Sequence, residues 1–386
     1  MKRLLLPILM LGFSNQAFAQ QDFFALTGKN GNAIVFNDFR ALDLENGVSG
    51  ATIFSAESTP RVFSDVRNMN VSEEKSGFNQ SQSPSMASLA FDQKNNQLFF
   101  MPMFSSNIYA MDLQSKNIVL IENMVAKTTP CDINSHFTRM TAGYDGNIYV
   151  TNNAATQFLK IEKKRGKYVV SDLGAISDDE SNGKNSINQM STGFGGDMIA
   201  DAENNFYIFS ASGNVFKIAT QTRKATFIGA ISGLPNNYSV NGAAVDSKGN
   251  VVIANALGGS LHSVNLETLQ ANPIAQNINL HVYDLASKYF ANDQRLIATA
   301  TGVEIYPTKI SDQTVNISIN DKNVKGNVAV EIYDMSGKNV MKQSLTNSRN
   351  KVEKISLKSL NQGVYLVNVT DESGKILVSK KVLIAN

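Results

Sequence analysis

The sequence predicts an all-β protein, a β-propeller followed by a small C-terminal β-sandwich. Along residues 20–302, short runs of β-branched and aromatic residues alternate with turns rich in Asp, Asn and Gly. This phrase recurs at intervals that suit one four-stranded unit each. From residue 303 the recurrence ends, and Lys, Val and Asn become more frequent. No sustained 3.6-residue apolar stripe indicates long helices.

Six turns mark the recurrence in the first region. Each is a polar triplet before an apolar strand, and the triplets end at residues 32, 97, 147, 205, 250 and 295. The intervals are 65, 50, 58, 45 and 45 residues, and repeats of about 40–50 residues are typical of propeller blades. We therefore expect six blades. Because the longer intervals are irregular, a β-sandwich or a solenoid of unrelated hairpins is the alternative. Residues 22–27 suit either the innermost strand of the first blade or a closing strand of the last.

The N-terminus has the order of a secretory signal peptide. Lys2 and Arg3 precede an apolar stretch at residues 4–13, and a small-residue site ends at Ala19, before Gln20. Ten residues at ~1.5 Å each span about half of a ~30 Å hydrocarbon core, so cleavage is favoured over permanent anchoring. A buried N-terminal helix is the alternative. The predicted boundaries are 1–19 for the signal peptide, 20–302 for the propeller and 303–386 for the C-terminal domain.

Charge and composition exclude several classes of protein. The formal charge of +2 equals the contribution of Lys2 and Arg3, so the mature chain is neutral. Such a chain lacks the concentrated basic face that a nucleic-acid partner requires. Cys131 is the only cysteine, which precludes an intramolecular disulfide. The three histidines lack zinc-site spacing, and no nucleotide-binding or nucleophile motif is present.

Residues 303–386 carry a set of motifs that belong together. A Tyr-Pro pair opens the region, a hairpin turn follows, a Leu-x-x-Gly-x-Tyr phrase precedes a strand, and a Lys-Lys pair begins the final run. The residues concerned are Tyr306, Pro307, Gly337, Leu360, Gly363, Tyr365, Lys380 and Lys381.

These motifs resemble the C-terminal sorting domain of type IX secretion, type A, found on cargo of Bacteroidetes-type bacteria. The family usually opens with Tyr-Pro-Asn-Pro, whereas Thr308 and Lys309 follow Pro307 here. The resemblance implies export by the inner-membrane machinery through the signal peptide, then across the outer membrane by the type IX machinery. The expected location is therefore the medium or the outer cell surface, reached through the periplasm, with no transmembrane segment in the mature protein. An ordinary accessory sandwich is the alternative.

The propeller region carries a second, looser resemblance. Residues 240–251, Val-Asn-Gly-Ala-Ala-Val-Asp-Ser-Lys-Gly-Asn-Val, are similar to NHL-repeat and gluconolactonase-like six-bladed propellers. In that family an Asn at the position of Asn241 binds a metal ion, and Asp197 and Asp284 occupy corresponding points in the neighbouring repeats. The acidic ligand of the first blade has only Asp22 as a counterpart. A hard cation such as Ca²⁺ needs several oxygens that converge, and an Asn-Gly pair also serves as a plain turn.

Two functions of different class follow. The favoured one is a binding protein without a cofactor, whose propeller face holds an extracellular ligand: a glycan, a peptide or another envelope protein. Loops at the innermost strands of a propeller converge on a central channel, where ligands bind. The alternative is a calcium-dependent, lactonase-like hydrolase with Asn241, Asp197 and Asp284 around that channel. No catalytic residue is predicted in the C-terminal domain.

Overall fold

The computed structural model describes residues 22–28, 36–44, 48–55, 61–71, 86–277, 281–293, 302–310, 313–319, 324, 326–346 and 352–385. Every structural statement below concerns these residues. The predicted signal peptide with its cleavage site at Ala19 and Gln20, and the turn that ends at residue 32, lie outside them.

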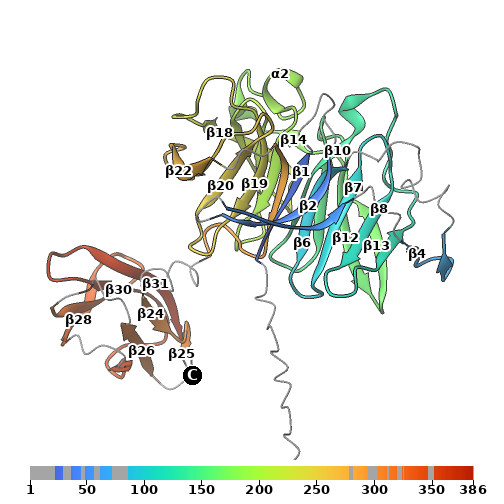
Figure 1. The fold of residues 1–386 in the computed structure, drawn as a ribbon. Coiled ribbons are helices and arrows are strands. Elements are labelled where there is room, and N and C mark those ends of the chain that lie inside the picture. Colours follow the sequence, from blue (N-terminus) through green and yellow to red (C-terminus); the bar gives the residue numbers. More distant parts are fainter. Residues whose placement is uncertain are drawn as a thin grey trace, which may run out of the picture.

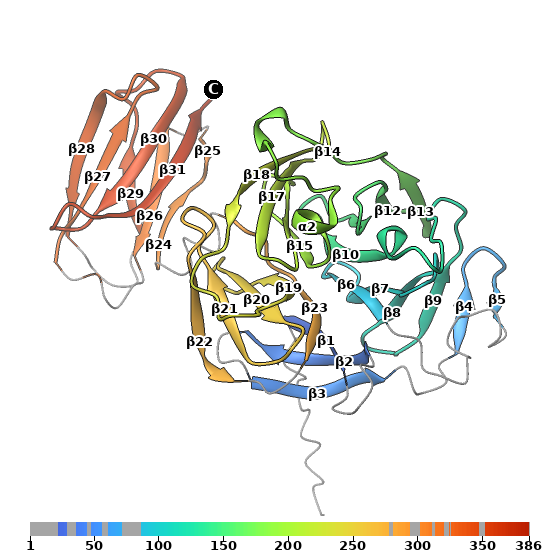
Figure 2. The same cartoon turned by 90° about the horizontal axis from the view of Figure 1, so that it is seen from above.

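The first region is a ring of antiparallel sheets around a central axis (Figures 1 and 2). Blade 1 contains β6 (Met86–Asp92), β7 (Gln97–Pro102), β8 (Ile108–Asp112) and β9 (Ile118–Ile121), extended by β4 (Val62–Ser64) and β5 (Met69–Asn70). Blade 2 contains β10 (Phe137–Ala142), β11 (Ile148–Asn152), β12 (Phe158–Lys164) and β13 (Lys167–Asp172). Blade 3 contains β15 (Asp197–Ala200), β16 (Phe206–Phe209), β17 (Asn214–Ala219), β18 (Lys224–Ala230) and, at its outer edge, β14 (Ser177–Asp178).

Blade 4 contains β19 (Val240–Val245), β20 (Val251–Asn255), β21 (Ser260–Val264) and β22 (Ala271–Asn277). Blade 5 combines both ends of the propeller: β23 (Val282–Ser287) is innermost, followed by β1 (Phe23–Gly28), β2 (Phe36–Asp43) and β3 (Val48–Ser55). The loops carry three short helices, η1 (Ile133–Ser135), η2 (Glu180–Asn182) and α2 (Met190–Gly193). None of the helices in the described residues has the length and apolar character needed to span a bilayer.

The propeller class is confirmed, but the described residues form five blades and not six. The innermost strands contact one another in a closed circle, β6 to β10, β15, β19, β23 and back to β6, which leaves no gap for a further blade. The expectation failed because the first and last turns were counted as two separate blades. The two ends of the propeller region instead form blade 5 together, and in this blade Leu26 lies opposite Asp284. Residues 22–27 accordingly supply the second strand of this blade, next to the innermost one.

The polar turns that mark the repeat cap the hairpins between the first two strands of blades 1 to 4. In blade 4, Asp246 ends the innermost strand, and its Oδ1 accepts hydrogen bonds from the backbone N–H groups of Lys248 and Asn250, both at 2.8 Å. The Asn250 side chain returns a bond to Asp246 Oδ2 at 2.9 Å. An Asp side chain that satisfies turn N–H groups in this way favours the tight reversal over an extended chain.

Five hydrophobic clusters hold the ring together, and each draws its buried side chains from two adjacent blades. Between blades 5 and 1, for example, Phe24 stacks near Phe91 with ring centroids 4.7 Å apart, and Phe39 lies 4.9 Å from Phe100. Because every blade buries both faces against its neighbours, removal of one blade would expose two of these clusters.

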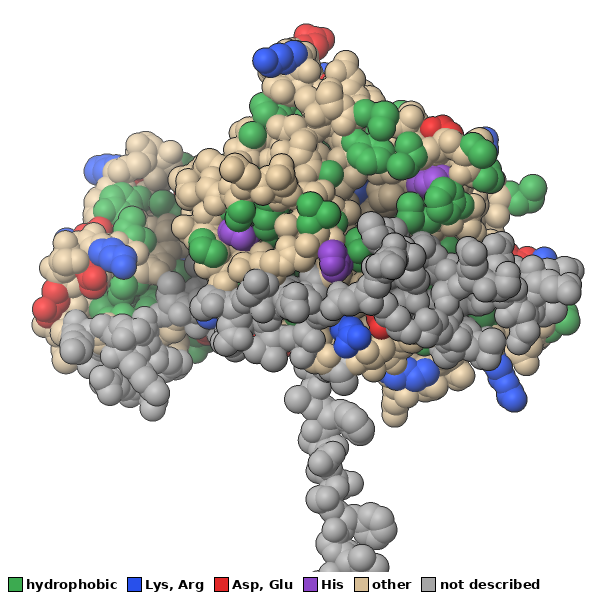
Figure 3. All heavy atoms as spheres, turned by 45° about the horizontal axis from the view of Figure 1, so that its top comes forward, with side chains coloured by type: hydrophobic (Ala, Val, Ile, Leu, Met, Phe, Trp, Pro, Cys, Tyr) green, Lys and Arg blue, Asp and Glu red, His purple; other side chains and the backbone are tan. Residues whose placement is uncertain are grey.

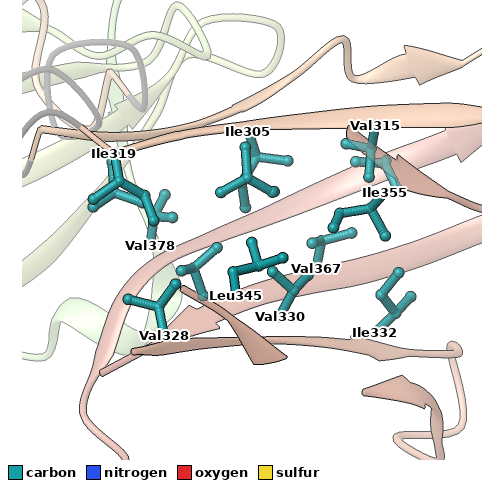
Figure 4. Packing of buried hydrophobic residues seen from close by; sticks show 14 of the residues in the cluster. Ile305, Val315, Ile319, Val328, Val330, Ile332, Leu345, Ile355, Val367 and Val378 are labelled. Atoms are coloured by element: carbon teal, nitrogen blue, oxygen red, sulfur yellow. The ribbon is translucent and has the colours of Figure 1, made fainter. Parts of the chain in front are cut away.

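The C-terminal region is a two-sheet sandwich, as the sequence predicts. One sheet contains β24 (Val303–Tyr306), β26 (Thr314–Ile319) and β29 (Val352–Ser356). The other contains, in spatial order, β25 (Lys309–Ile310), β31 (Ile376–Ile384), β30 (Gly363–Thr370), β27 (Val328–Tyr333) and β28 (Asn339–Leu345). Val, Ile and Leu side chains from both sheets form its own core (Figure 4). No propeller residue of the described chain belongs to this cluster.

Candidate functional site at the channel mouth

One local irregularity recurs where the innermost strands begin. In four blades the pairing with the second strand skips one residue, which forms a β-bulge. The skipped residues are Ala87 in blade 1, Thr138 in blade 2, Asn241 in blade 4 and Tyr283 in blade 5. Bulges redirect a side chain out of the pleat and often occur beside functional sites. Here all four skipped residues line a single pocket at the mouth of the channel.

Blade 3 has no bulge at this point and carries a glycine instead. Gly196 precedes β15 and has a φ of +79°. A Cβ atom at this position would lie 1.7 Å from the carbonyl oxygen of Phe209, so only glycine fits. Gly196 also lines the pocket, which therefore receives one backbone position from each of the five blades.

The pocket has a volume of about 150 Å³ and mostly apolar walls. Met86, Met103, Ile133 and Phe194 provide these walls, and none of the described lining residues is charged. Further apolar side chains, including Phe104 and Met190, are exposed in the loops of the same face. Figure 3 views the protein obliquely from the side of α2, where hydrophobic side chains gather in several groups.

Polar groups occupy one side of the mouth. The Thr138 hydroxyl donates to Asn153 Oδ1 at 2.6 Å, and Asn153 Nδ2 donates to the carbonyl oxygen of Ile133 at 2.9 Å. The Ser239 hydroxyl donates to Asn241 Oδ1 at 3.1 Å. This bond fixes the orientation of the Asn241 amide, whose Nδ2 has no partner in the described part of the chain. A donor is thus available to a ligand.

A second layer lies one residue further along each innermost strand. Its members are Ser88, Arg139, Asp197, Gly242 and Asp284. The four side chains of this layer are completely buried. We call these five residues the buried ring; it seals the channel beneath the mouth with polar and charged groups.

Arg139 is the cation of the buried ring, and within the described residues all its hydrogen bonds go to backbone carbonyl oxygens. Its Nε donates to Gly195 O at 2.9 Å, and its terminal nitrogens donate to the carbonyl oxygens of Gly193, Asn152 and Asn153. The guanidinium thereby joins blade 2 to the glycine-rich loop before β15. Burial lowers the pKa of Arg139 to about 10, and the nearby Asp197 carboxylate opposes this shift.

Asp197 joins three innermost strands. Its Oδ1 accepts from the N–H of Met198 at 2.7 Å, and its Oδ2 accepts from Ala243 N at 2.6 Å and Leu285 N at 3.3 Å. Burial raises the pKa of the Asp197 carboxyl, while these N–H groups favour its ionised form.

Asp284 is the less well satisfied carboxyl of the pair. Neither of its oxygens has a well-placed hydrogen-bond donor, although the N–H groups of Leu89 and Leu285 face it. Burial and the neighbouring Asp197 carboxylate both raise the pKa of Asp284. A protonated Asp284 that donates to an ionised Asp197 satisfies both groups, and together with Arg139 it leaves the buried ring neutral.

The metal ligands implied by the sequence are not arranged as one site. Asp197 and Asp284 meet in the buried ring, whereas Asn241 lies one level above them at the mouth. Asp22 lies at the opposite end of β23, where it binds Lys288 Nζ at 2.5 Å and accepts from the Tyr289 hydroxyl at 2.7 Å.

The donor set does not fit a hard cation. Ca²⁺ takes six to eight oxygen ligands, but both Asp197 oxygens already accept backbone N–H groups and the Arg139 guanidinium carries a positive charge beside them. Within the described residues no group of three or more His, Cys, Asp or Glu side chains is placed to hold a metal.

Sequence reasoning missed Arg139 and Ser88. A positional signal exists: Asp197 stands four residues before Asp201, the residue that caps the first hairpin of blade 3. The same count back from Asp92 gives Ser88, and from Gly143 gives Arg139. Alignment of the repeats on their turns would have located the ring positions of blades 1 to 4, whereas the innermost strand of blade 5 pairs with β1 and has no such turn.

The sorting-motif residues occupy structural positions in the sandwich. Leu360 and Tyr365 pack against its core, and the Tyr365 hydroxyl donates to Asn361 O at 3.0 Å. Gly337 has a φ of +81° in the turn between β27 and β28. Tyr306 and Pro307 follow one another at the end of β24, and Gly363 opens β30. Lys380 and Lys381 are adjacent in β31 but differ in environment, as described below.

The fold and the site define a class of protein: a five-bladed propeller with a closed channel and an apolar mouth, followed by a β-sandwich that has a separate hydrophobic core. Residues 304–385 match the family model described as a secretion system C-terminal sorting domain. The sandwich is thus a type IX sorting domain, and the protein is exported to the cell surface or the medium.

Comparisons of the whole chain add no function. No curated protein sequence matches it. Among solved structures it is similar to PorZ, an essential surface component of the type IX secretion system of Porphyromonas gingivalis, with 14% identity and a TM-score of 0.34 over 91% of this chain and 50% of PorZ. The extracellular domain of a one-component system from B. thetaiotaomicron gives 12% and 0.34 over 91% and 47%. A streptogramin B lyase gives 10% and 0.32 over 80% and 86%. The chain spans about half the length of the first two.

Proposed function

We propose that the exported protein is a binding protein whose propeller holds an uncharged apolar side chain of a peptide or protein in the channel mouth. The observation that carries this proposal is the convergence of one bulge or glycine position from each blade on a single apolar pocket. A bulge at the same point of four blades interrupts the regular strand pairing in each of them. Such a repeated interruption is typical of a functional site.

The dimensions and walls of the pocket favour a single side chain. Its volume of about 150 Å³ equals that of an apolar cavity able to hold a benzene molecule, about 150 Å³. Methionine walls such as Met86 and Met103 adapt to ligands of different shape. The free Asn241 Nδ2 is placed to donate to a peptide carbonyl of the bound segment.

The polar inventory disfavours a glycan. A buried sugar ring presents several hydroxyl groups, and each costs free energy unless it is hydrogen-bonded. Thr138 and Asn153 already bond to each other, which leaves few groups for such a ligand. The side chains of the buried ring beneath are fully buried, so a charged group in the mouth would not reach a partner there.

Calorimetric titration with a series of peptides that differ only in their central residue tests the proposal. Peptides with a central Leu or Phe are expected to bind, and those with Ser or Lys are not. Ala87→Leu fills the mouth and is expected to weaken binding at least roughly tenfold. Asn272→Ala, an exposed change on β22 of blade 4, is the matched control and should bind as the wild type does. Saturable binding on a glycan array that Ala87→Leu leaves unchanged would overturn the proposal.

A further inference from the structure

The outer face of the larger sandwich sheet, which takes no part in the hydrophobic core, carries a groove. Strand pairing places Tyr333, Leu366 and Lys381 side by side on β27, β30 and β31. With Met335 and Asn368 they line a depression of about 450 Å³. We call this surface the Lys381 groove.

The groove exposes apolar side chains on the face turned away from the core. Met335 is 68% exposed and Leu366 39%, and Leu383 beside the groove is 41% exposed. The inner face of the same sheet already buries the core residues, among them Val367 and Val382. The solvent-facing side of an antiparallel sheet is normally polar, so apolar residues that remain exposed there mark a surface for a partner.

Lys381 is the one cation among the described residues that line the groove, and the acidic groups nearby are engaged elsewhere. Glu331 pairs with Lys342 at 2.6 Å and accepts from the Tyr333 hydroxyl at 2.7 Å. Asp334 accepts from the backbone and hydroxyl of Ser336 and caps its own turn. Lys381 is exposed and forms no ion pair with any described residue.

The two adjacent lysines therefore have different environments. Lys380 Nζ donates to Ile305 O at 3.0 Å and so ties β31 to β24 of the opposite sheet. This contact accounts for Lys380 within the folded domain. No ion pair with a described residue of the domain engages Lys381, which projects from the opposite face of the same strand.

We propose that the Lys381 groove is the surface through which the type IX machinery binds this sorting domain. The partner fits it with apolar side chains around a carboxylate that pairs with Lys381, because an unpaired ammonium in an apolar groove gains most from an acidic partner. This inference concerns the sandwich alone and is independent of the ligand proposed for the propeller.

Secretion of the full chain from a bacterium with type IX secretion tests the inference. Lys381→Gln, Lys381→Glu and Leu366→Ser are expected to reduce the exported fraction roughly tenfold, as hot-spot changes do, with the protein retained in the periplasm. Lys381→Arg should restore export. Because Lys381 has no partner inside the domain, the melting temperature of purified Lys381→Gln protein should equal that of the wild type.

Lys354→Glu is the matched control. Lys354 is an exposed lysine on β29 of the other sheet, so its reversal changes the net charge of the domain by the same amount as Lys381→Glu without touching the groove. Normal export of Lys381→Gln would overturn the inference, and so would an equal loss of export in Lys354→Glu. Neither outcome bears on peptide binding at the propeller mouth, which is measured on purified protein.

Discussion

The channel mouth and the buried ring are one residue apart along the same innermost strands, yet their side chains differ in polarity and charge. The mouth is apolar, uncharged and open. The ring below it holds Arg139, Asp197 and Asp284, all fully buried. The difference shows that a bulge separates two tasks within one strand: the skipped residue serves the surface, and the next residue joins neighbouring blades.

This division has an energetic consequence. Arg139 and Asp197 in the buried ring bond to backbone groups, so removal of either side chain leaves buried polar groups unsatisfied in a medium of low dielectric constant. Mouth residues such as Asn241 have fewer partners, and their loss affects contacts with solvent or ligand. We therefore expect ring substitutions to change stability and mouth substitutions to change binding.

Arg139→Met should have the largest effect. It leaves the Asp197 carboxylate without its neighbouring cation and removes the donor from the carbonyls of Gly193 and Gly195. We expect the free energy of unfolding to fall by about 3–5 kcal/mol, measured by urea denaturation. Arg165→Met, in an exposed turn, should change it by about 0.5 kcal/mol or less. Equal midpoints for the two variants would show that the ring does not hold the blades together.

Asp284→Asn should alter the pH dependence of stability. The pKa of Asp284 is raised in the folded state. The contribution of Asp284 to the stability of the wild type is therefore largest at acid pH, and it falls as the pH rises from the unfolded pKa, near 4, toward the folded pKa. Asparagine can donate to Asp197 and does not titrate. The free energy of unfolding of the variant should therefore rise relative to that of the wild type as the pH rises from about 4.

Urea denaturation between pH 4 and pH 9 measures this gain. Asp172→Asn is the control, because Asp172 is an exposed carboxyl of blade 2. Parallel curves for wild type and Asp284→Asn would contradict the assignment of the proton to Asp284.

Ala87→Leu sharpens the comparison from the side of the mouth. The added carbons enter the pocket and displace no hydrogen bond of the ring, so the free energy of unfolding should change by only about 0.5 kcal/mol. A loss comparable to that of Arg139→Met would mean that mouth and ring form one packed unit. Thermal unfolding of the variant beside the wild type measures the difference.

Added calcium should have the smallest effect. Both oxygens of Asp197 already accept backbone N–H groups, and the Arg139 guanidinium lies nearby, so saturating Ca²⁺ should leave the melting temperature unchanged. A rise in melting temperature that Asp197→Asn abolishes would contradict this and would favour the calcium-dependent alternative.

Local chemistry made much of the fold predictable. The turn capped by Asp246 could be predicted from the sequence, because the Asp side chain bonds to N–H groups two and four residues later and needs no distant partner. The number of blades depends on which strands meet across the ring. The pairing of Leu26 with Asp284 leaves no local trace, and the expected count was wrong for that reason.

The candidate site followed the same rule. Asp197 and Asp284 were identified from their place before a strand, and the structure brings them together. Arg139 was missed because a single Arg in an alternating strand reads as a solvent-facing residue, and its partners are carbonyl groups that no side-chain pattern reveals. Asn241 was placed with the two acids, but the bulge turns it to the level above.

The closure of blade 5 also dictates an order of assembly. As the chain is synthesised, β1 emerges long before β23, so its inner edge has no hydrogen-bonding neighbour until almost the whole propeller has been made. An unpaired strand edge is a template for association with other chains. A chain in which residues 282–287 have not yet folded therefore leaves the inner edge of β1 open to association, and shielding of residues 23–28 until blade 5 closes would favour closed rings.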